Sequence, residues 1–432
     1  MNNRKKCNKK RLTLLLLAAA MIGLISGCGK QADQEQETVS EAIKIPMVLT
    51  VDPSTGNKNE EKLVEAFNKT YEGIYKVEVE WAMETEEEYR QNLKRLNVAD
   101  QLPTVMTDLR MLPSFYQMMI QDGRLEDLAP YIAADPQWQE MIEPVVLEGC
   151  SEADGSVYLA PLSTAAFSCS GVFWNEELFA QAGITTFPET WEDFWACCEK
   201  LQESNITPLA LHTEGTAWAP MLFATAELAS TREGASFMKE TYPASYNNEN
   251  GIHMAETLQK LFSYTTENAL HTDYDVAYDN FFSGRAAMIP NGYWMMDQIP
   301  AEWAAKVHFA PFPGNVLISS PETFGWSLKA GCSPEVKEGA IAFLKFRTQL
   351  NQEEKQQLFD ESAEGKSQAE QDYLVAYEAN PQIVPNYQVK WNSILQEETL
   401  GDYLPELATG EISPEQFVQY EDESIEEFQR EQ

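Results

Sequence analysis

The apolar positions of residues 43–107 switch repeatedly between strand spacing and helix spacing. Apolar side chains recur every three or four residues in 57–70 and in 85–98, where they predict two amphipathic helices. Three segments with strand character surround these helices: 43–50, 75–81 and 103–107. Strands that alternate with helices in this way favour a doubly wound α/β sheet, in which ligands bind outside the carboxyl ends of the strands.

A second series of the same kind begins after Pro161. Residues 167–174 predict a hydrophobic strand, and Thr190 with Asp193 has the spacing of a capping box at a helix start. Residues 350–372 are rich in Gln and Glu and predict a peripheral helix, and residues 421–432 predict an acidic terminal helix or tail. The two series indicate two α/β lobes within one chain of 432 residues.

The amino-terminal end has the pattern of an export signal. Six cations precede the almost wholly apolar residues 12–25, and no acidic residue comes before Cys28. The apolar run of about 15 residues is shorter than the roughly 20 that a membrane-spanning helix needs, although a retained span is the alternative. We therefore expect residues 1–27 to be a signal peptide.

The segment that follows the apolar run predicts a lipid anchor. Residues 24–28, Leu-Ile-Ser-Gly-Cys, resemble the bacterial lipobox, in which the cysteine is lipidated and becomes the mature amino terminus. An ordinary buried thiol is the alternative for Cys28. Residues 28–42 are polar and acidic, so we expect a lipidated, disordered tether.

Charge and cysteine content exclude several classes of function. Asp plus Glu number 68 against 31 Lys plus Arg, a net charge of −37, which excludes nucleic acid as the natural partner. Beyond Cys7 and Cys28 five cysteines remain, an odd number without a C-x-x-C spacing, so we expect buried thiols and neither a zinc site nor a redox motif.

No catalytic motif is present, whereas aromatic residues are abundant. The sequence contains no phosphate-binding loop, no G-x-S-x-G and no H-x-x-x-H, so we expect no catalytic residues, no metal and no cofactor. Trp218, Trp294 and Trp326 stand beside or near glycine in predicted loops. Flat apolar rings near carboxylates and amides suit a sugar, with core packing as the alternative for each tryptophan.

From residue 43 onward the order of short motifs resembles the extracellular solute-binding proteins of ATP-driven sugar importers, the superfamily of maltose-binding protein. The matching segments are 103–105, 123–128, 154–161, 173–179, 182–184, 188–194, 206–210 and 282–294. Four positions depart from the family pattern, which has Asp in place of Thr104 and Lys in place of Ser156, Glu176 and Arg285. The smaller number of cations near the expected site makes an anionic ligand less favoured.

The resemblance implies ligand-binding residues and a domain division. The residues it implies are Trp294, Trp218, Trp391 and Asp108, and the positions of Tyr293 and Trp326 beside or near glycine add these two to the expected ligand-binding residues. Lobe 1 would comprise residues 43–161 plus about 320–375, and lobe 2 residues 162–319 plus about 376–432. A hinge would join the lobes, as in class II-like periplasmic binding proteins.

The function implied is that of a monomeric receptor anchored by lipid to the outer face of the bacterial cytoplasmic membrane. It would close on a small solute, a sugar or oligosaccharide, and deliver it to the transmembrane subunits of an ABC-type permease. It would not be an enzyme. Two alternatives stay open: a receptor that serves a sensor kinase, and a surface carbohydrate-active enzyme.

Overall fold

The computed structural model describes residues 42–49, 58–81, 86–107, 109, 113–162, 168–213, 217–319, 325–360, 366–392 and 394–431. The expected signal peptide, Cys28 and the tether as far as residue 41 lie outside these ranges. Within them, no helix combines the length and the apolar character that crossing a membrane requires.

The first sheet has four strands in the order β2-β1-β3-β9. The parallel strands are β1 (Ile43–Leu49), β2 (Tyr75–Trp81) and β3 (Val105–Met106), and β9 (Ser327–Leu328) joins β3 antiparallel. The helices that precede residue 162 are α1 (Lys58–Thr70), α2 (Glu86–Val98), α3 (Pro113–Gln121), α4 (Ala129–Ala134), α5 (Pro136–Met141) and α6 (Pro144–Cys150). This sheet is therefore built mainly from the first series of elements.

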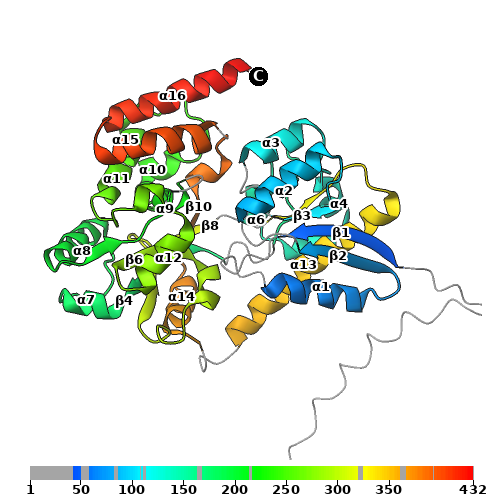
Figure 1. Ribbon diagram of the computed structural model, residues 1–432, viewed down its shortest axis with the longest axis horizontal. Coiled ribbons are helices and arrows are strands. Elements are labelled where there is room, and N and C mark those ends of the chain that lie inside the picture. Colours follow the sequence, from blue (N-terminus) through cyan, green and yellow to red (C-terminus); the bar gives the residue numbers. More distant parts are fainter. Residues whose placement is uncertain are drawn as a thin grey trace, which may run out of the picture. The chain divides into compact units, whose positions relative to one another are not determined.

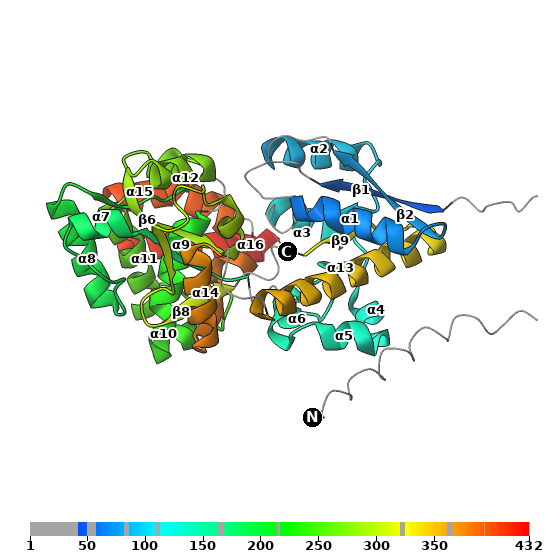
Figure 2. The same ribbon diagram turned by 90° about the horizontal axis from the view of Figure 1, so that it is seen from below.

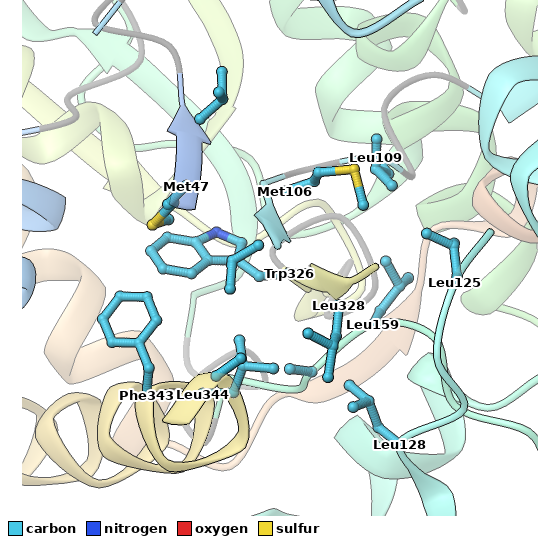
Figure 3. Packing of buried hydrophobic residues seen from close by; sticks show 14 of the residues in the cluster. Met47, Met106, Leu109, Leu125, Leu128, Leu159, Trp326, Leu328, Phe343 and Leu344 are labelled. Atoms are coloured by element: carbon cyan, nitrogen blue, oxygen red, sulfur yellow. The ribbon is translucent and has the colours of Figure 1, made fainter. Parts of the chain in front are cut away.

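The long helix α13 (Pro334–Asp360) returns to this sheet from far along the chain and lies alongside β1 and α1 (Figure 1 and Figure 2). Gly339 allows the close approach, because a Cβ there would lie 2.6 Å from Cδ1 of Tyr75. In the core between them, Trp326 and Phe343 pack with a ring separation of 5.9 Å, below Met47 of β1 (Figure 3). The burial of these side chains holds α13 on the first sheet.

The second sheet is mixed and has the strand order β10-β8-β4-β6-β5, with β7 paired to β4. Its strands are β4 (Ser170–Asn175), β5 (Thr207–Leu209), β6 (Ala286–Gly292), β7 (Val307–Ala310), β8 (Val316–Ser319) and β10 (Gln382–Pro385). The pairs β5–β6 and β8–β10 are parallel, whereas β4 is antiparallel to β6, β7 and β8. All six positions of β4 are buried, as expected of a central strand.

Helices cover the second sheet, and further helices near the carboxyl terminus, among them α15 and α16, pack on these (Figure 1). The α-helices are α7 (Glu176–Gln181), α8 (Trp191–Glu203), α9 (Trp218–Ala229), α10 (Arg232–Phe237), α11 (Glu249–Phe262), α12 (Tyr274–Phe282), α14 (Gln368–Glu378), α15 (Leu404–Thr409) and α16 (Pro414–Glu431). Four shorter or irregular helical segments are η3 (Ala269–His271), η4 (Tyr293–Gln298), η6 (Tyr387–Lys390) and η7 (Ile394–Tyr403). A separate apolar cluster forms where α9, α11, α15, α16 and η7 meet.

The predicted elements agree with the structure in most of the chain. The expected helix at 57–70 is α1, the strand at 75–81 is β2, and Thr190 accepts a hydrogen bond from the backbone N–H of Asp193 at the start of α8. One prediction was wrong: residues 368–372 are not peripheral, because α14 packs against β7 with Ala369 and Tyr373 fully buried. The two cores thus divide between Asp360 and Lys366, earlier than the boundary expected near residue 375.

A histidine–aspartate pair attaches α14 to β7. His308 Nδ1 lies 2.8 Å from Oδ2 of Asp372, and the His308 ring stacks on Trp174 at 4.5 Å. The hydrogen bond to Asp372 raises the pKa of His308 above its ordinary value, against the opposing effect of burial. A raised pKa means that the charged pair stabilises the fold below the histidine's ordinary pKa of about 6.5 and that this contribution is lost as pH rises through the folded value.

We expect Asp372→Asn to lower the free energy of unfolding at pH 6 on the order of 1 kcal/mol, because it removes a partly buried charge-assisted hydrogen bond. The loss should shrink at pH 9, where His308 is neutral in both proteins. Calorimetric unfolding at the two pH values measures the difference, and Asp279→Asn, on the exposed side of α12, is the control. An equal loss at both pH values would contradict this role for the pair.

Candidate functional site

The parallel pairing of β5 with β6 places the ends of two adjacent strands at one edge of the second sheet. Leu209 of β5 pairs with Met288 of β6, and both strands run in the same direction. The chain after β5 carries His212, and the chain after β6 carries Trp294. Side chains at the carboxyl ends of parallel strands are the ordinary position for a ligand in an α/β sheet.

Four half-buried side chains gather at this edge, and we refer to them as the aromatic cluster: His212, Trp218, Tyr274 and Trp294. The rings of Trp218 and Trp294 lie 5.7 Å apart with 48° between their planes. His212 stacks on Trp218 at 6.2 Å and meets Tyr274 edge to face at 5.9 Å. The four residues therefore form one continuous aromatic surface.

Trp294 is positioned by the glycine two residues before it. A Cβ on Gly292 would lie 2.1 Å from Cζ3 of the Trp294 ring, so the ring rests directly on the glycine backbone. Any larger residue at position 292 would displace the indole. The role of Gly292 in the Gly-Tyr-Trp sequence is therefore to leave room for the Trp294 ring.

Trp218 and Tyr274 are the first residues of their helices. Trp218 opens α9 directly after Ala217, whose φ of 52° gives the backbone a left-handed turn. Tyr274 opens α12, where the Asp273 side chain accepts a hydrogen bond from the N–H of Val276. The Tyr274 hydroxyl donates to Oε1 of Gln298 at 2.7 Å, which fixes the ring at the edge of the cluster.

At neutral pH the aromatic cluster carries no charge. Burial lowers the pKa of His212 to about 4, and the nearby Asp273 opposes this effect only in part. Burial also raises the pKa of Tyr274 above its ordinary value. The cluster can therefore stack on apolar faces and exchange hydrogen bonds, but it does not attract an anion by charge.

Two expected ligand-binding tryptophans are core residues instead. Trp391 is 0% exposed and packs against Tyr246 and Tyr387 at ring separations of 5.8 and 5.3 Å. Trp326 is 1% exposed, and the Arg347 guanidinium covers its ring at 3.9 Å. Neither ring presents a face to a ligand, so we remove both from the candidate site.

Tyr293 and Asp108 have different outcomes. Tyr293 is half-buried and packs against Tyr373 of α14 at 4.8 Å, so its ring supports the core beside the site. Asp108 lies outside the described residues. Thr107, just before it, is buried and its backbone N–H donates to the Tyr89 hydroxyl, so Asp108 follows a well-anchored strand and stays a prediction.

Two residues of the aromatic cluster, His212 and Tyr274, were not predicted from the sequence. His212 lacks the spacing of a metal-binding histidine. A usable signal was its position just after a short strand at 207–209 that precedes the loop of Trp218. Tyr274 gave no signal, because its role depends on a contact between residues 62 positions apart in the chain.

We next consider metal sites and reactive cysteines in the part of the chain that the structure describes. No group of His, Cys, Asp and Glu side chains there has the arrangement of a metal site. The five described cysteines are free thiols: Cys150, Cys169, Cys197, Cys198 and Cys332. Burial raises the pKa of Cys197 to about 12, which makes it a poor nucleophile.

Comparison with known proteins shows the family to which this chain is similar. The family model of bacterial extracellular solute-binding proteins matches residues 62–363. A multiple sugar-binding protein of Streptococcus mutans is 25% identical over 205 residues, which cover 44% of this chain and 47% of that protein. The chain thus aligns with about half the length of that relative.

Two further likenesses extend over more of the chain. An uncharacterised ABC transporter extracellular-binding protein of Pyrococcus horikoshii is 24% identical over 78% of this chain and 76% of its own length. The solved structure of a chitin oligosaccharide binding protein superposes with a TM-score of 0.69 at 20% identity, covering 89% of this chain and 98% of its own. At this identity the likeness establishes the fold, and it confirms the predicted two-lobe binding-protein architecture.

The burial of the tryptophans predicts different effects on stability. We expect Trp391→Ala to lower the free energy of unfolding by about 3–5 kcal/mol, because a fully buried ring leaves a cavity. Trp294→Ala should cost clearly less, since its ring is only half-buried. Chemical denaturation of both variants measures the difference, and a Trp391→Ala protein as stable as the wild type would contradict the core assignment.

Proposed function

Because the chain belongs to the family of bacterial extracellular solute-binding proteins, we propose that it binds a sugar or oligosaccharide and delivers it to an ABC-type membrane importer. The observation that carries this proposal is the aromatic cluster at the joint carboxyl end of β5 and β6. The names of two similar proteins, which refer to multiple sugars and to chitin oligosaccharides, support the same class of ligand.

The chemistry of a sugar fits this surface. A pyranose has apolar C–H faces that stack on indole rings and hydroxyl groups that need hydrogen bonds. Trp218 and Trp294 supply two rings at an angle of 48°, and the rims of the cluster supply the polar atoms of His212 and Tyr274. An uncharged cluster favours a neutral ligand over an acidic one.

We propose further that the protein works as a hinged receptor that performs no chemistry on its ligand. Three connections link the two cores along the sequence: residues 163–167, 320–324 and 361–365. A ligand that contacts both lobes would favour a closed state by the free energy that the second set of contacts adds. The closed state would be the one that the permease subunits recognise.

Anchoring at the outer face of the cytoplasmic membrane completes the proposal. Its support is the lipobox-like sequence before Cys28, after a signal-like apolar run. Two or more acyl chains on one cysteine would hold the protein firmly, where a single chain binds reversibly. The acidic residues that follow would act as the tether between lipid and lobes.

The test uses residues 29–432 and a panel of neutral sugars: maltotriose, xylotriose, raffinose and triacetylchitotriose. We expect at least one sugar to raise the melting temperature, and a ligand at 100 times its Kd stabilises by about 2.7 kcal/mol. Solution scattering with that sugar should show a smaller radius of gyration, and chromatography should recover the sugar unchanged.

Trp294→Ala serves as the site variant in the same titrations, with Trp303→Ala, outside the aromatic cluster, as its control. Removal of a stacking ring costs about 2 kcal/mol of binding free energy, which corresponds to an affinity about 30-fold weaker. Cleavage of the sugar would identify an enzyme and overturn the receptor proposal. Binding by Trp294→Ala as tight as by the wild type would overturn the site.

For the anchor, we expect Cys28→Ala to abolish incorporation of a labelled fatty acid and to leave uncleaved precursor or released protein. Cells that express the full-length chain are labelled and fractionated, with Cys332→Ala as the matched control that keeps its label. A mature amino terminus other than Cys28 in mass spectra of the wild-type protein would contradict the prediction.

A further inference from the structure

His212 is held firmly within the aromatic cluster by the chain around it. The backbone N–H of Thr213 donates to the carbonyl of Thr272 at 3.2 Å, and the Thr213 hydroxyl donates to the carbonyl of Ala269 at 3.1 Å. The imidazole itself lies between Trp218, on which it stacks, and Tyr274, which meets it edge to face. Its position is therefore set by backbone bonds and ring contacts.

The two ring nitrogens of His212 have no polar partner in the part of the chain that the structure describes. Across the residues that the structure describes, no hydrogen bond or ion pair involves either nitrogen. Two other histidines differ, because His308 pairs with Asp372 and His253 lies 3.6 Å from a carboxylate oxygen of Glu227. A half-buried imidazole without a polar partner has one donor and one acceptor left for another molecule.

The state of the imidazole defines what it can bind. Burial keeps His212 neutral at physiological pH, so one nitrogen carries a hydrogen and the other a lone pair. This combination matches a hydroxyl group, which both donates and accepts. It gives no electrostatic preference to a carboxylate or a phosphate.

We propose that His212 is a specificity-determining residue of the aromatic cluster, where its uncharged imidazole hydrogen-bonds a hydroxyl group of a neutral sugar stacked on Trp218 and Trp294. This inference rests on the proposed function and deepens it. The protein prefers neutral sugars to acidic ones, and the His212 side chain is responsible for this preference. His212 positions and discriminates the ligand, whereas the indole rings supply the stacking.

The experiment adds two acidic sugars, 3′-sialyllactose and trigalacturonic acid, to the neutral panel and measures affinities by calorimetry with the chain of residues 29–432. His212→Phe keeps a ring against Trp218 and Tyr274 but removes both nitrogens. His212→Gln replaces them with an amide donor and acceptor. His253→Phe, on α11 and outside the cluster, is the matched control.

We expect His212→Phe to bind the preferred neutral sugar at least 10-fold more weakly than the wild type, and His212→Gln to stay within about fivefold. The control should bind as the wild type does. Among monodeoxy analogues of that sugar, one should bind the wild type and His212→Phe equally, because its missing hydroxyl is the partner of His212. His212→Gln and the analogues together decide the matter if His212→Phe does not fold.

The outcomes separate this inference from the proposed function. If no sugar of either charge binds the wild type, the proposed function fails and the inference fails with it. If a neutral sugar binds but His212→Phe binds it equally well, or no deoxy analogue removes the difference, only the role of His212 is overturned. Preference of the wild type for an acidic sugar also overturns the inference while the receptor function stands.

Discussion

The parallel hydrogen bonding between β5 and β6 is the constraint on which the candidate site depends. These strands are separated by 76 residues of chain, yet their pairing carries His212 and Trp294 to the same edge of the second sheet. Everything else at the site is arranged around this edge: Gly292 seats the Trp294 ring, and the starts of α9 and α12 bring Trp218 and Tyr274. A change in the register of one short strand would therefore move the whole site.

The fold could be predicted wherever the residues of a single helix or strand are enough to determine its structure. Helix α1 and strand β2 follow from apolar spacing, and the start of α8 follows from the Thr190–Asp193 capping pair. The buried position of helix α14 could not be predicted in this way, since its sequence, rich in Gln and Glu, resembles that of a surface helix. What buries Ala369 and Tyr373 is a contact with β7, about sixty residues earlier in the chain.

The same distinction separates the tryptophans. Trp294, which stays a predicted ligand-binding residue, stands in a local Gly-Tyr-Trp motif whose glycine makes room for its ring. Trp326 and Trp391 were misassigned because a tryptophan near a predicted loop can face either way. Arg347 of α13 covers the Trp326 ring, and Tyr246, far earlier in the chain, packs against the Trp391 ring together with the nearby Tyr387. Long-range packing, which a single sequence does not reveal, decided both cases.

The free cysteines have a practical consequence for handling the protein. Four of the five described thiols are buried and Cys332 is half-buried, so the described fold forms without any disulfide bond. Its formation needs neither an oxidant nor a disulfide isomerase, and a reducing cytoplasm is a suitable place to produce it. With Cys7 and Cys28 left out, Cys332 becomes the natural position for one spectroscopic label, attached just before α13 on the first lobe and far along the chain from the aromatic cluster.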